Sequence, residues 1–245
     1  METRILVQSH SGEFFVLKNE EISHKHGGKM MILKFEDTDV WGFEGAIYGM
    51  RLPMNSRHKS DSRIGDNGEF IIGENDMNLA KMLIKGTQPH CKFRRMIHVQ
   101  ADLTAPRFFW SEYDTYKVGT TANSQSTMHK LLNTSLPITK DMFIYDERDA
   151  EIVERTIEHL EDLRKTYRHF QAKDEKNPKL LNDLLHRAKT ILPEGFLQTR
   201  TIDLNYETLA QMYKWRKNHR LPEWSEDFMA WIKTLPYAAE LIMGE

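Results

Sequence analysis

Residues 86 to 129 carry the most informative pattern of the chain and read GTQPHCKFRRMIHVQADLTAPRFFWSEYDTYKVGTTANSQSTMH. Its middle part, Phe93 to Asp102, alternates apolar and polar residues in its second half. This period of two predicts a strand that turns Ile97 and Val99 toward the core. The aromatic-rich segment Arg107 to Tyr116 follows and predicts a helix. A strand leading into a helix therefore forms the centre of the expected fold.

A dense group of short polar side chains, Asn123-Ser124-Gln125-Ser126-Thr127, follows Gly119 in the same stretch. Such side chains, together with backbone amides freed by a turn, can hold a phosphate or the edge of a base. The same residue types are also preferred as caps of a following helix. From the residues alone, a ligand site and an ordinary capping loop both stay open.

A second informative stretch, residues 192 to 219, reads LPEGFLQTRTIDLNYETLAQMYKWRKNH. It predicts an extended segment that carries Arg200, followed by a helix from Tyr206 to Asn218. Arg216 and His219 are three residues apart and share a face of that helix if it continues. Arginine suits phosphate because its planar group donates two hydrogen bonds at once. A solvated basic patch is the alternative interpretation.

The flanking sequence adds strands before the first stretch. Residues 1–36 predict a hairpin or meander, because apolar runs are separated by a polar segment that ends in two glycines. Asp37 or Thr38 is then expected to cap a helix that ends near Met50. The polar segment 53–74 predicts a long irregular loop, of the kind that is often functional.

Several later segments repeat apolar residues at helical spacing, which predicts helices with one buried face. The first of them is expected to be capped by Asn75 or Asp76 and to bury Leu79, Met82 and Leu83. The longest is expected to bury Ile152, Ile157, Leu160, Leu163, Tyr167 and Phe170. This longest helix is expected over residues 147–170. Three further helices are expected over residues 177–190, 206–218 and 223–233.

Composition limits the class of protein. The chain has 245 residues, of which 40% are hydrophobic and 29% charged, and this predicts one α+β domain over residues 1–245. The formal net charge of −2 gives no overall attraction to nucleic acid, so no nucleic-acid partner is expected. Cys91 is the only cysteine, which suits a cytoplasmic protein without an intrachain disulfide. No run of residues is apolar enough to predict a membrane span.

Together the two stretches resemble the flavin-dependent thymidylate synthase (ThyX) family. In the first stretch, Gly86 and His90 precede the strand, and Arg107 matches the arginine that opens the family's helix. The serine, asparagine and second serine of the family's signature fall on Thr121, Asn123 and Ser126. In the second stretch, the matching positions are Leu192-Pro193, Arg200, Asn205, Arg216 and His219.

The resemblance implies a fold, an activity and a set of site residues. It implies a ThyX-like single domain with an antiparallel sheet and a helix-rich remainder, assembled as a homotetramer. The implied reaction is FAD-dependent methylation of dUMP to dTMP, with methylenetetrahydrofolate and NADPH as co-substrates. The implied nucleotide-binding residues are Arg107, Glu112, Asn123, Ser124, Gln125, Ser126, Arg200 and Arg216. The implied cofactor-binding residues are Tyr116, Lys117, Asn205 and His219. No catalytic residue is assigned, and no metal site is expected.

Several signature positions depart from the family's pattern. Thr115-Tyr116-Lys117 stand in place of its Arg-His-Arg, which helps to hold the flavin. Ser124 falls on a glutamate, Met128 on an arginine and Glu112 on a glutamine. Three functions therefore stay open: a flavoenzyme that makes dTMP, a nucleotide-binding protein without methyl transfer, and a structural assembly protein.

Overall fold

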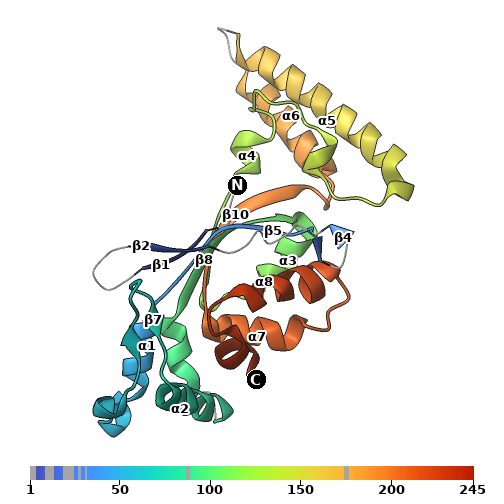
Figure 1. Ribbon diagram of the computed structural model, residues 1–245. Coiled ribbons are helices and arrows are strands. Elements are labelled where there is room, and N and C mark those ends of the chain that lie inside the picture. The colour runs from blue at the N-terminus through green and yellow to red at the C-terminus, as the bar shows by residue number, and fades with distance from the viewer. Residues whose placement is uncertain are drawn as a thin grey trace. The chain divides into compact units, whose positions relative to one another are not determined.

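The structure is a computed structural model (Figure 1). It describes residues 4–8, 14–18, 25–26, 29–30, 32–86, 89–173 and 177–245. Contacts divide the chain into two compact units. Unit 1 comprises Met1–Leu103, Asp114–Asn123 and Thr201–Glu245, and unit 2 comprises Thr104–Tyr113 and Ser124–Arg200. The expectation of one domain over residues 1–245 stays a prediction.

A six-stranded sheet has the strand order β2-β1-β5-β8-β10-β9. Its strands are β1 (Arg4–Gln8), β2 (Phe14–Lys18), β5 (Lys34–Trp41), β8 (His98–Pro106), β9 (Thr120–Ser124) and β10 (Leu197–Asn205). Strand β1 pairs antiparallel with β2 and parallel with β5. Two short antiparallel hairpins lie outside this sheet: β3 (Lys25–His26) with β4 (Lys29–Met30), and β6 (Arg63–Ile64) with β7 (Phe70–Ile71). A hairpin does form within residues 1–36, but it pairs β2, which contains the apolar run Phe14–Leu17, with β1 instead of with the second apolar run that follows the two glycines.

The first helix begins later than the sequence predicts. Asp37 and Thr38, expected as its cap, lie within β5, and α1 covers Phe43–Met50. The chain enters α1 through Gly42, whose φ is 93°. A Cβ on Gly42 would lie 2.0 Å from the carbonyl oxygen of Met96, so only glycine fits this entry. The packing against Met96 is a long-range contact that overrides the local capping preference.

The strand expected over Phe93 to Asp102 is correct only in its second half. Ile97 and Val99 are fully buried while Gln100 is exposed, as predicted. The preceding residues form a 3-10 helix, His90–Met96, instead of strand. That helix buries the neighbours Phe93 and Arg94 together. A strand cannot do this on one face, because its successive side chains point to opposite sides.

The 53–74 segment is anchored rather than irregular throughout. It contains two short 3-10 helices, Leu52–Met54 and Arg57–Lys59, followed by the β6–β7 hairpin. Asp61 accepts hydrogen bonds from the backbone amides of Asn75 (2.9 Å) and Asp76 (3.1 Å). The segment is thereby tied to the start of α2 (Glu74–Lys85).

The expected cap at Asn75 or Asp76 is wrong, because α2 begins at Glu74, so that both residues lie inside it, and the Asp76 side chain is buried. Its carboxylate forms an ion pair with Arg51 and accepts hydrogen bonds from the hydroxyls of Ser60 and Ser62, each at 2.5 Å. Burial alone would raise the pKa of Asp76. The two serine hydroxyls and Arg51 outweigh it and hold the pKa below its ordinary value.

The buried stripe expected on α2 is also different. Met82 is 66% exposed, and Leu79 and Leu83 are only half-buried, whereas Asp76 and Ala80 are buried. The helix is therefore held by a polar contact on its inner face as well as by apolar packing. A pattern of apolar residues cannot reveal a polar anchor of this kind.

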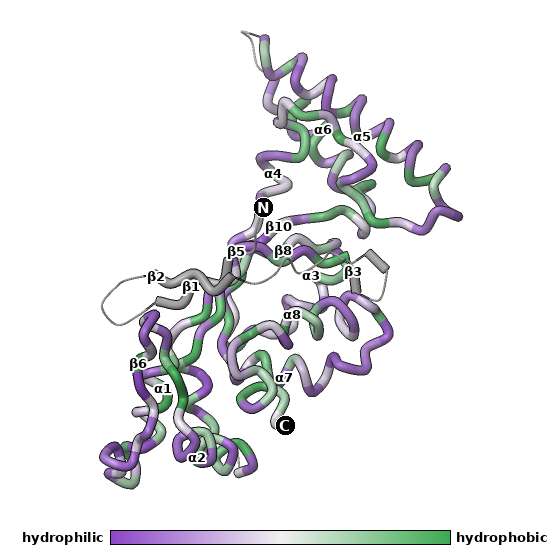
Figure 2. The backbone as a smooth tube through the Cα atoms, in the orientation of Figure 1, coloured by the Kyte–Doolittle hydropathy of each residue, from purple (hydrophilic) through white to green (hydrophobic). Residues whose placement is uncertain are grey.

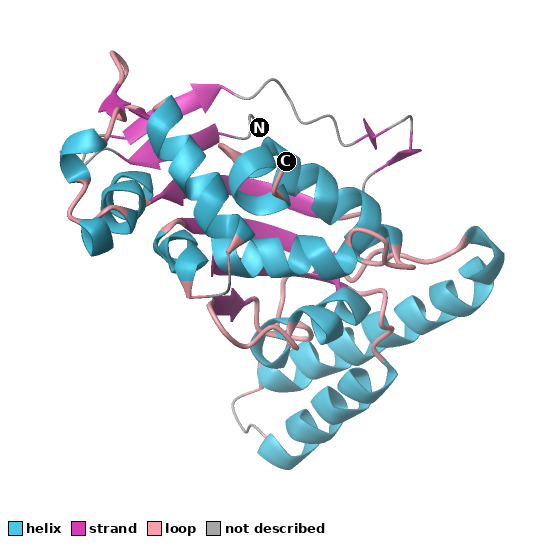
Figure 3. Ribbon diagram, turned by 90° about the horizontal axis from the view of Figure 1, so that it is seen from below, coloured by secondary structure: helices cyan, strands magenta, loops and turns pink. Residues whose placement is uncertain are grey.

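The C-terminal helices cover the sheet in unit 1 (Figure 3). They are α7 (Tyr206–Arg216), a π-helix at Glu223–Phe228, α8 (Met229–Thr234) and a second π-helix at Ala239–Met243. Trp231 stacks on Phe35 of β5 with ring centroids 4.3 Å apart, and its indole nitrogen donates to the hydroxyl of Thr38. Asp227 accepts hydrogen bonds from the amides of Ile32 (2.7 Å) and Leu33 (2.9 Å). These contacts fix the helical layer against β5.

A buried ion pair adds a further link within unit 1. Arg94 of the 3-10 helix contacts Glu207 of α7, with Nη2 and Oε2 2.5 Å apart. A second nitrogen of Arg94 donates to the carbonyl oxygen of Leu241 at 3.1 Å. One guanidinium thus joins the segment before β8 to α7 and to the last helix.

Unit 2 is built around a helical pair, α5 (Ala150–Gln171) and α6 (Pro178–Ile191), as predicted. It also contains α3 (Arg107–Tyr113) and the short α4 (Thr127–Lys130). The alternating hydropathy along α5 and α6 is visible in Figure 2. The hydrophobic core of unit 2 consists of Leu131, Leu132, Ile138, Phe143, Ile157, Leu160, Leu163, Leu184, Ala188 and Leu192. Ile152 was expected in this core, but it is 70% exposed because its neighbour Val153 takes the inward position.

The mixed α/β class with antiparallel pairing and many helices is confirmed. Among the helices of the described residues, none combines the length and apolar character needed to cross a bilayer. The assembly state stays a prediction.

Replacing Asp76 with asparagine is expected to lower the free energy of unfolding by about 3–5 kcal/mol, because Arg51 would keep its charge without a partner in a buried site. The lowered pKa of Asp76 sets the pH dependence. Its stabilising contribution is present above the ordinary pKa of 3.8 and is lost as pH falls through the lowered value. Urea denaturation at several pH values measures both effects.

The matched control is Asp66→Asn, which changes an exposed carboxylate in the same segment. A change within about 0.5 kcal/mol is expected for an exposed position. Equal losses for the two variants would contradict the anchoring role of Asp76.

Candidate functional site

The residues implied by the resemblance divide between the two units. Unit 1 holds Tyr116, Lys117, Asn123, Asn205, Arg216 and His219. Unit 2 holds Arg107, Glu112, Ser124, Gln125, Ser126 and Arg200. Within each unit, some of these residues from distant parts of the sequence come together.

In unit 1, Tyr116, Lys117 and Asn205 line one pocket of about 470 Å³. The pocket lies between the segment Thr115–Gly119 and the first turns of α7. Its lining residues are Arg95, Thr115, Tyr116, Lys117, Val118, Gly119, Asn205, Glu207, Thr208 and Gln211. Positions 115–119 and 205–211 come from the two stretches that carry the resemblance, so these stretches meet in space.

A tight turn at Gly119 makes this meeting possible. Gly119 has a φ of 72°, and a Cβ on it would lie 2.6 Å from Asn205 Nδ2 and 2.7 Å from Thr208 Oγ1. Asn205 also caps α7, because its Oδ1 accepts the amide of Thr208 at 3.0 Å. Thr208 Oγ1 in turn donates to the carbonyl oxygen of Val118 at 3.2 Å. The pocket wall is therefore a packed turn and not a loose loop.

Arg216, implied as a nucleotide ligand, packs behind the pocket. Its Nε donates to the hydroxyl of Tyr116 at 2.9 Å, and its Nη1 is 2.9 Å from His219 Nε2. The guanidinium carbon lies 5.4 Å from the ring centroid of Tyr116 and 4.8 Å from that of Trp224. Arg216 and His219 thus hold Tyr116 in place, and neither lines the pocket.

The pocket presents positive charge and amide groups. Arg95 and Lys117 are exposed cations at its edge, while Glu207 is paired with Arg94. Gln211 adds a side-chain amide from α7. This set of groups suits a phosphate-bearing ligand. Sequence reasoning did not assign Arg95 or Gln211, although the basic run Lys92–Arg95 was a visible signal.

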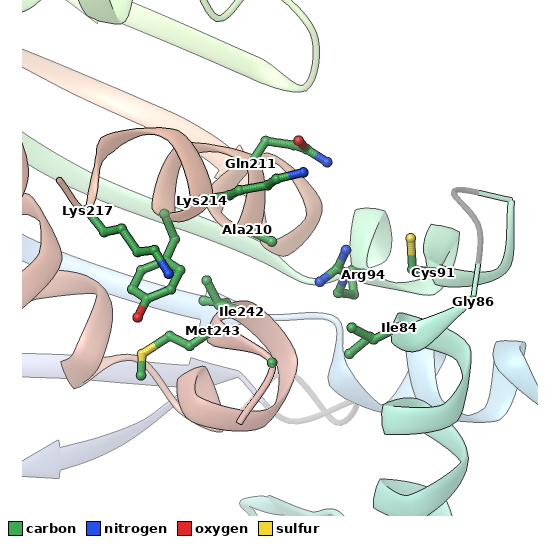
Figure 4. A pocket seen from close by; sticks show the side chains of 12 residues that line it. Ile84, Gly86, Cys91, Arg94, Ala210, Gln211, Lys214, Lys217, Ile242 and Met243 are labelled. Atoms are coloured by element: carbon green, nitrogen blue, oxygen red, sulfur yellow. The ribbon is translucent and has the colours of Figure 1, made fainter. Parts of the chain in front are cut away.

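A second pocket in unit 1, of about 320 Å³, is lined by the second half of α7 and by the last helix (Figure 4). Arg94 and the buried thiol of Cys91 contribute to it, together with Lys214 and Lys217 at the end of α7. Only Gln211 lines both pockets. Gly86 of the first family-like stretch also lines it, but none of the implied nucleotide-binding or cofactor-binding residues does.

In unit 2, Gln198 connects Gln125 and Arg200. Gln198 Nε2 donates to the carbonyl oxygen of Gln125 at 2.7 Å, and its Oε1 accepts from Arg200 Nε at 3.3 Å. The Arg200 guanidinium lies 4.2 Å from the ring centroid of Trp110, whose indole nitrogen donates to the Gln198 carbonyl oxygen. The polar turn and Arg200 therefore belong to one hydrogen-bonded group. Sequence reasoning missed Gln198 because a single glutamine in a strand carries no motif.

Gln125 and Ser126 also line a pocket of about 310 Å³ in unit 2. Ser126 caps the short α4 through the amide of His129 at 3.3 Å, so the capping interpretation of this residue is correct. Most of the lining is apolar, and its polar edge carries Thr127 and Lys130. Two of the implied nucleotide-binding residues, Glu112 and Ser124, do not line this pocket.

Two further cations of unit 2 lie near that polar edge. Lys189 donates to the hydroxyl of Thr127 at 2.6 Å. Arg107 donates to the carbonyl oxygen of Leu192 at 3.3 Å and lies 3.4 Å from Glu194. Burial, and to a smaller degree the charge of Arg107, lower the pKa of Lys189 below its ordinary value. Sequence reasoning assigned Arg107 but not Lys189.

No group of three or more histidine, cysteine, aspartate or glutamate side chains is arranged to hold a metal ion in the described part of the chain. The candidate groups are therefore the cationic pocket of unit 1 and the polar edge of the pocket in unit 2. Both are built from residues that donate hydrogen bonds to anions.

The arrangement of the sheet and helices is that of the ThyX-like fold. ThyX from Helicobacter pylori with FAD and dUMP is 15% identical, with a TM-score of 0.61 over 88% of this chain and 99% of that chain. A second structure of that protein with the same two ligands is 16% identical, with a TM-score of 0.58 over 82% and 94%. The UMP/dUMP methylase PolB from Streptomyces cacaoi, bound with 5-Br UMP, is 12% identical, with a TM-score of 0.52 over 87% and 94%. No family model and no curated protein sequence matches the chain.

Gly119→Ala is expected to destabilise unit 1 by more than the roughly 1–2 kcal/mol that a left-handed backbone costs a residue with a Cβ. The excess arises because the new methyl group would press on Asn205 and Thr208. Thermal unfolding measures it. The matched control is Gly244→Ala, since Gly244 also has a positive φ, 78°, but has open space around the added Cβ. Equal effects in the two variants would contradict the packed turn.

Lys189→Met is expected to change the pH dependence of stability. Because the pKa of Lys189 is lowered from 10.5, its charge is less favourable in the folded than in the unfolded state. This penalty is present below the lowered pKa and is relieved as pH rises toward 10.5. Wild type should therefore gain stability relative to Lys189→Met as pH rises, in urea denaturation. The control is Lys179→Met, which changes an exposed lysine on the same helix. If both variants show the same pH dependence of stability, Lys189 is not the group responsible.

Proposed function

We propose that this chain is a pyrimidine nucleotide-binding protein, and that it methylates dUMP to dTMP with FAD as its cofactor. The observation that carries the proposal is the pocket in unit 1, where Thr115–Gly119 and the first turns of α7 meet around two cations. The ThyX-like fold supports it, because ThyX structures with this fold contain FAD and dUMP.

The unit 1 pocket fits a phosphate-bearing cofactor. Arg95 and Lys117 supply the charge that a pyrophosphate requires, and the side chains of Asn205 and Gln211 supply polar contacts. Because Gly119 has no side chain, the segment Thr115–Gly119 that forms one wall of the pocket can pack directly against the start of α7. Bound and reduced, FAD would supply a hydride for the methyl group, while methylenetetrahydrofolate supplies the carbon and NADPH the reducing power.

The nucleotide is assigned to unit 2. Gln125, Ser126 and Arg200 present polar groups there, and Gln198 connects Gln125 to Arg200. Arg107 adds a positive charge, and Ser124 and Glu112 are proposed as further contacts. The chain is proposed to act as a homotetramer.

A second candidate function is nucleotide binding without methyl transfer. One observation favours it: Arg216 and His219 are engaged with Tyr116 instead of lining the pocket. A tyrosine held in this way cannot replace the charges of the Arg-His-Arg motif that the resemblance leads one to expect. In this case the chain would bind dUMP and leave it unchanged.

The test measures binding and turnover on the purified chain. Flavin absorbance and thermal stabilisation by FAD and by dUMP report binding. Chromatography of dUMP incubated with FAD, methylenetetrahydrofolate and NADPH reports dTMP. Arg95→Ala and Lys117→Ala are each expected to weaken FAD binding about tenfold, the effect of losing one charge-assisted hydrogen bond.

Lys233→Ala, an exposed change on α8, is the control and should leave both affinities unchanged. Stabilisation by dUMP without dTMP formation would select the second candidate function. A chain that responds to neither FAD nor dUMP would contradict both.

A further inference from the structure

The pocket of about 320 Å³ in unit 1 has no role in the proposed function. Its lining residues come from four places: the end of α2, the 3-10 helix before β8, the second half of α7 and the last helix (Figure 4). Sites for small molecules have volumes of roughly 300–1,000 Å³, so this pocket has room for a small ligand. The residues of the lining indicate the chemistry of that ligand.

Every charged residue in the lining is a cation. These residues are Arg94, Lys214 and Lys217, and no carboxylate lines the pocket. Arg94 is paired with Glu207, which cancels one of the three positive charges. Among the described residues, no carboxylate forms an ion pair with Lys214 or Lys217. The two lysine charges at the pocket are therefore uncompensated, and they favour an anionic ligand.

Arg94 is a cation that solvation at the surface does not explain, because it is only 6% exposed. Two of its N–H groups donate to Glu207, at 2.9 and 2.5 Å, and a third donates to the carbonyl oxygen of Leu241 at 3.1 Å. A guanidinium carries two more N–H groups than these three, and the part of the chain that the structure describes offers them no acceptor. Buried donors without an acceptor are costly, and an anion in the pocket would satisfy them.

The two lysines have a simpler interpretation, which is that they complement the dipole of α7 at its carboxyl end. The dipole accounts for their charge but not for their placement. The Lys214 ammonium lies 5.1 Å from the ring centroid of Trp215, and the Lys217 ammonium lies 5.4 Å from that of Tyr213. These cation–π contacts hold both groups near the helix surface instead of extended into water. Like charges three residues apart on a helix also repel each other, and a bound anion would relieve this repulsion.

The rest of the lining is mainly apolar. Ile84, Ala210, Ile242 and Met243 contribute to it. In the view of Figure 4, Ile242 and Met243 lie below the two lysines. An inorganic ion would leave this apolar surface in contact with water, whereas a ligand with an apolar body would cover it.

We propose that this pocket binds a small organic acid, whose carboxylate contacts Arg94, Lys214 and Lys217 and whose apolar body covers Ile242 and its apolar neighbours. Arginine and lysine hold carboxylates through charge-assisted hydrogen bonds. A carboxylate is compact, so it leaves most of the pocket to the apolar body. This inference does not rest on the proposed function, because Gln211 is the only residue that also lines the cationic pocket assigned to FAD.

The first experiment compares acids with neutral molecules of the same shape. Benzoate and hexanoate are each paired with the corresponding amide, benzamide or hexanamide, and thermal unfolding of the chain is followed at constant ionic strength. At least one acid is expected to raise the melting temperature, while its amide and inorganic phosphate have smaller effects. If neither acid stabilises the chain, or if amide or phosphate stabilises it as much as the acid does, the proposal is wrong.

The second experiment locates the binding with variants of the lining. Lys214→Gln and Lys217→Gln are each expected to weaken binding of the stabilising acid about fivefold, the effect of losing one exposed charge pair. Ala210→Leu keeps every charge but fills part of the apolar wall, and it should weaken binding at least as much. The matched control is Lys233→Gln, which changes an exposed lysine in the last turn of α8 and should leave the affinity unchanged. Calorimetry measures the affinities, and circular dichroism verifies that each variant is folded.

Equal acid affinities in wild type and in the two lysine variants would overturn the proposal, because the acid would then bind elsewhere. A chain that binds the acid through these lysines but binds neither FAD nor dUMP would keep this site and lose the proposed function. Binding of FAD and dUMP without any binding of the acids would leave the proposed function standing and overturn this inference.

Discussion

The contact between Gly119 and the first turn of α7 is the constraint on which the site in unit 1 depends. The backbone approaches Asn205 and Thr208 so closely that no side chain fits between them. Asn205 and Thr208 in turn hold the helix start and the carbonyl of Val118. Because of this contact, Thr115, Tyr116 and Lys117 lie next to α7 and line one pocket with it. The turn at Gly119, the cap of α7 at Asn205 and the position of Lys117 in the pocket therefore depend on one another.

The sequence predicted those features that depend on local periodicity. The helices at α5 and α6 and the inward faces of Ile97 and Val99 follow from spacing alone. The predictions failed where a distant partner decides the structure. Asp37 lies in β5, and the helix begins only after Gly42, which packs on Met96; Asp76 is buried where Arg51 pairs with it. Neither partner is visible in a window of neighbouring residues.

The site residues also divide into those that the sequence could indicate and those that depend on a distant partner. The sequence could indicate that the two stretches meet, since Tyr116, Lys117 and Asn205 line one pocket. It could not indicate that Arg216 donates to the hydroxyl of Tyr116, because the two residues lie a hundred positions apart and no local pattern joins them. It also could not find Lys189. Met128 stands where the resemblance leads one to expect an arginine, and a cation instead reaches the adjacent Thr127 from a helix some sixty positions later.

The anchoring of the 53–74 segment has a practical consequence. Asp76 binds Arg51, Ser60 and Ser62 together, so these contacts hold the backbone of the segment from its inner side. Met54 of this segment is 83% exposed. A spectroscopic label attached at this position would report the tumbling of unit 1 as a body, since the stem that carries it does not swing independently.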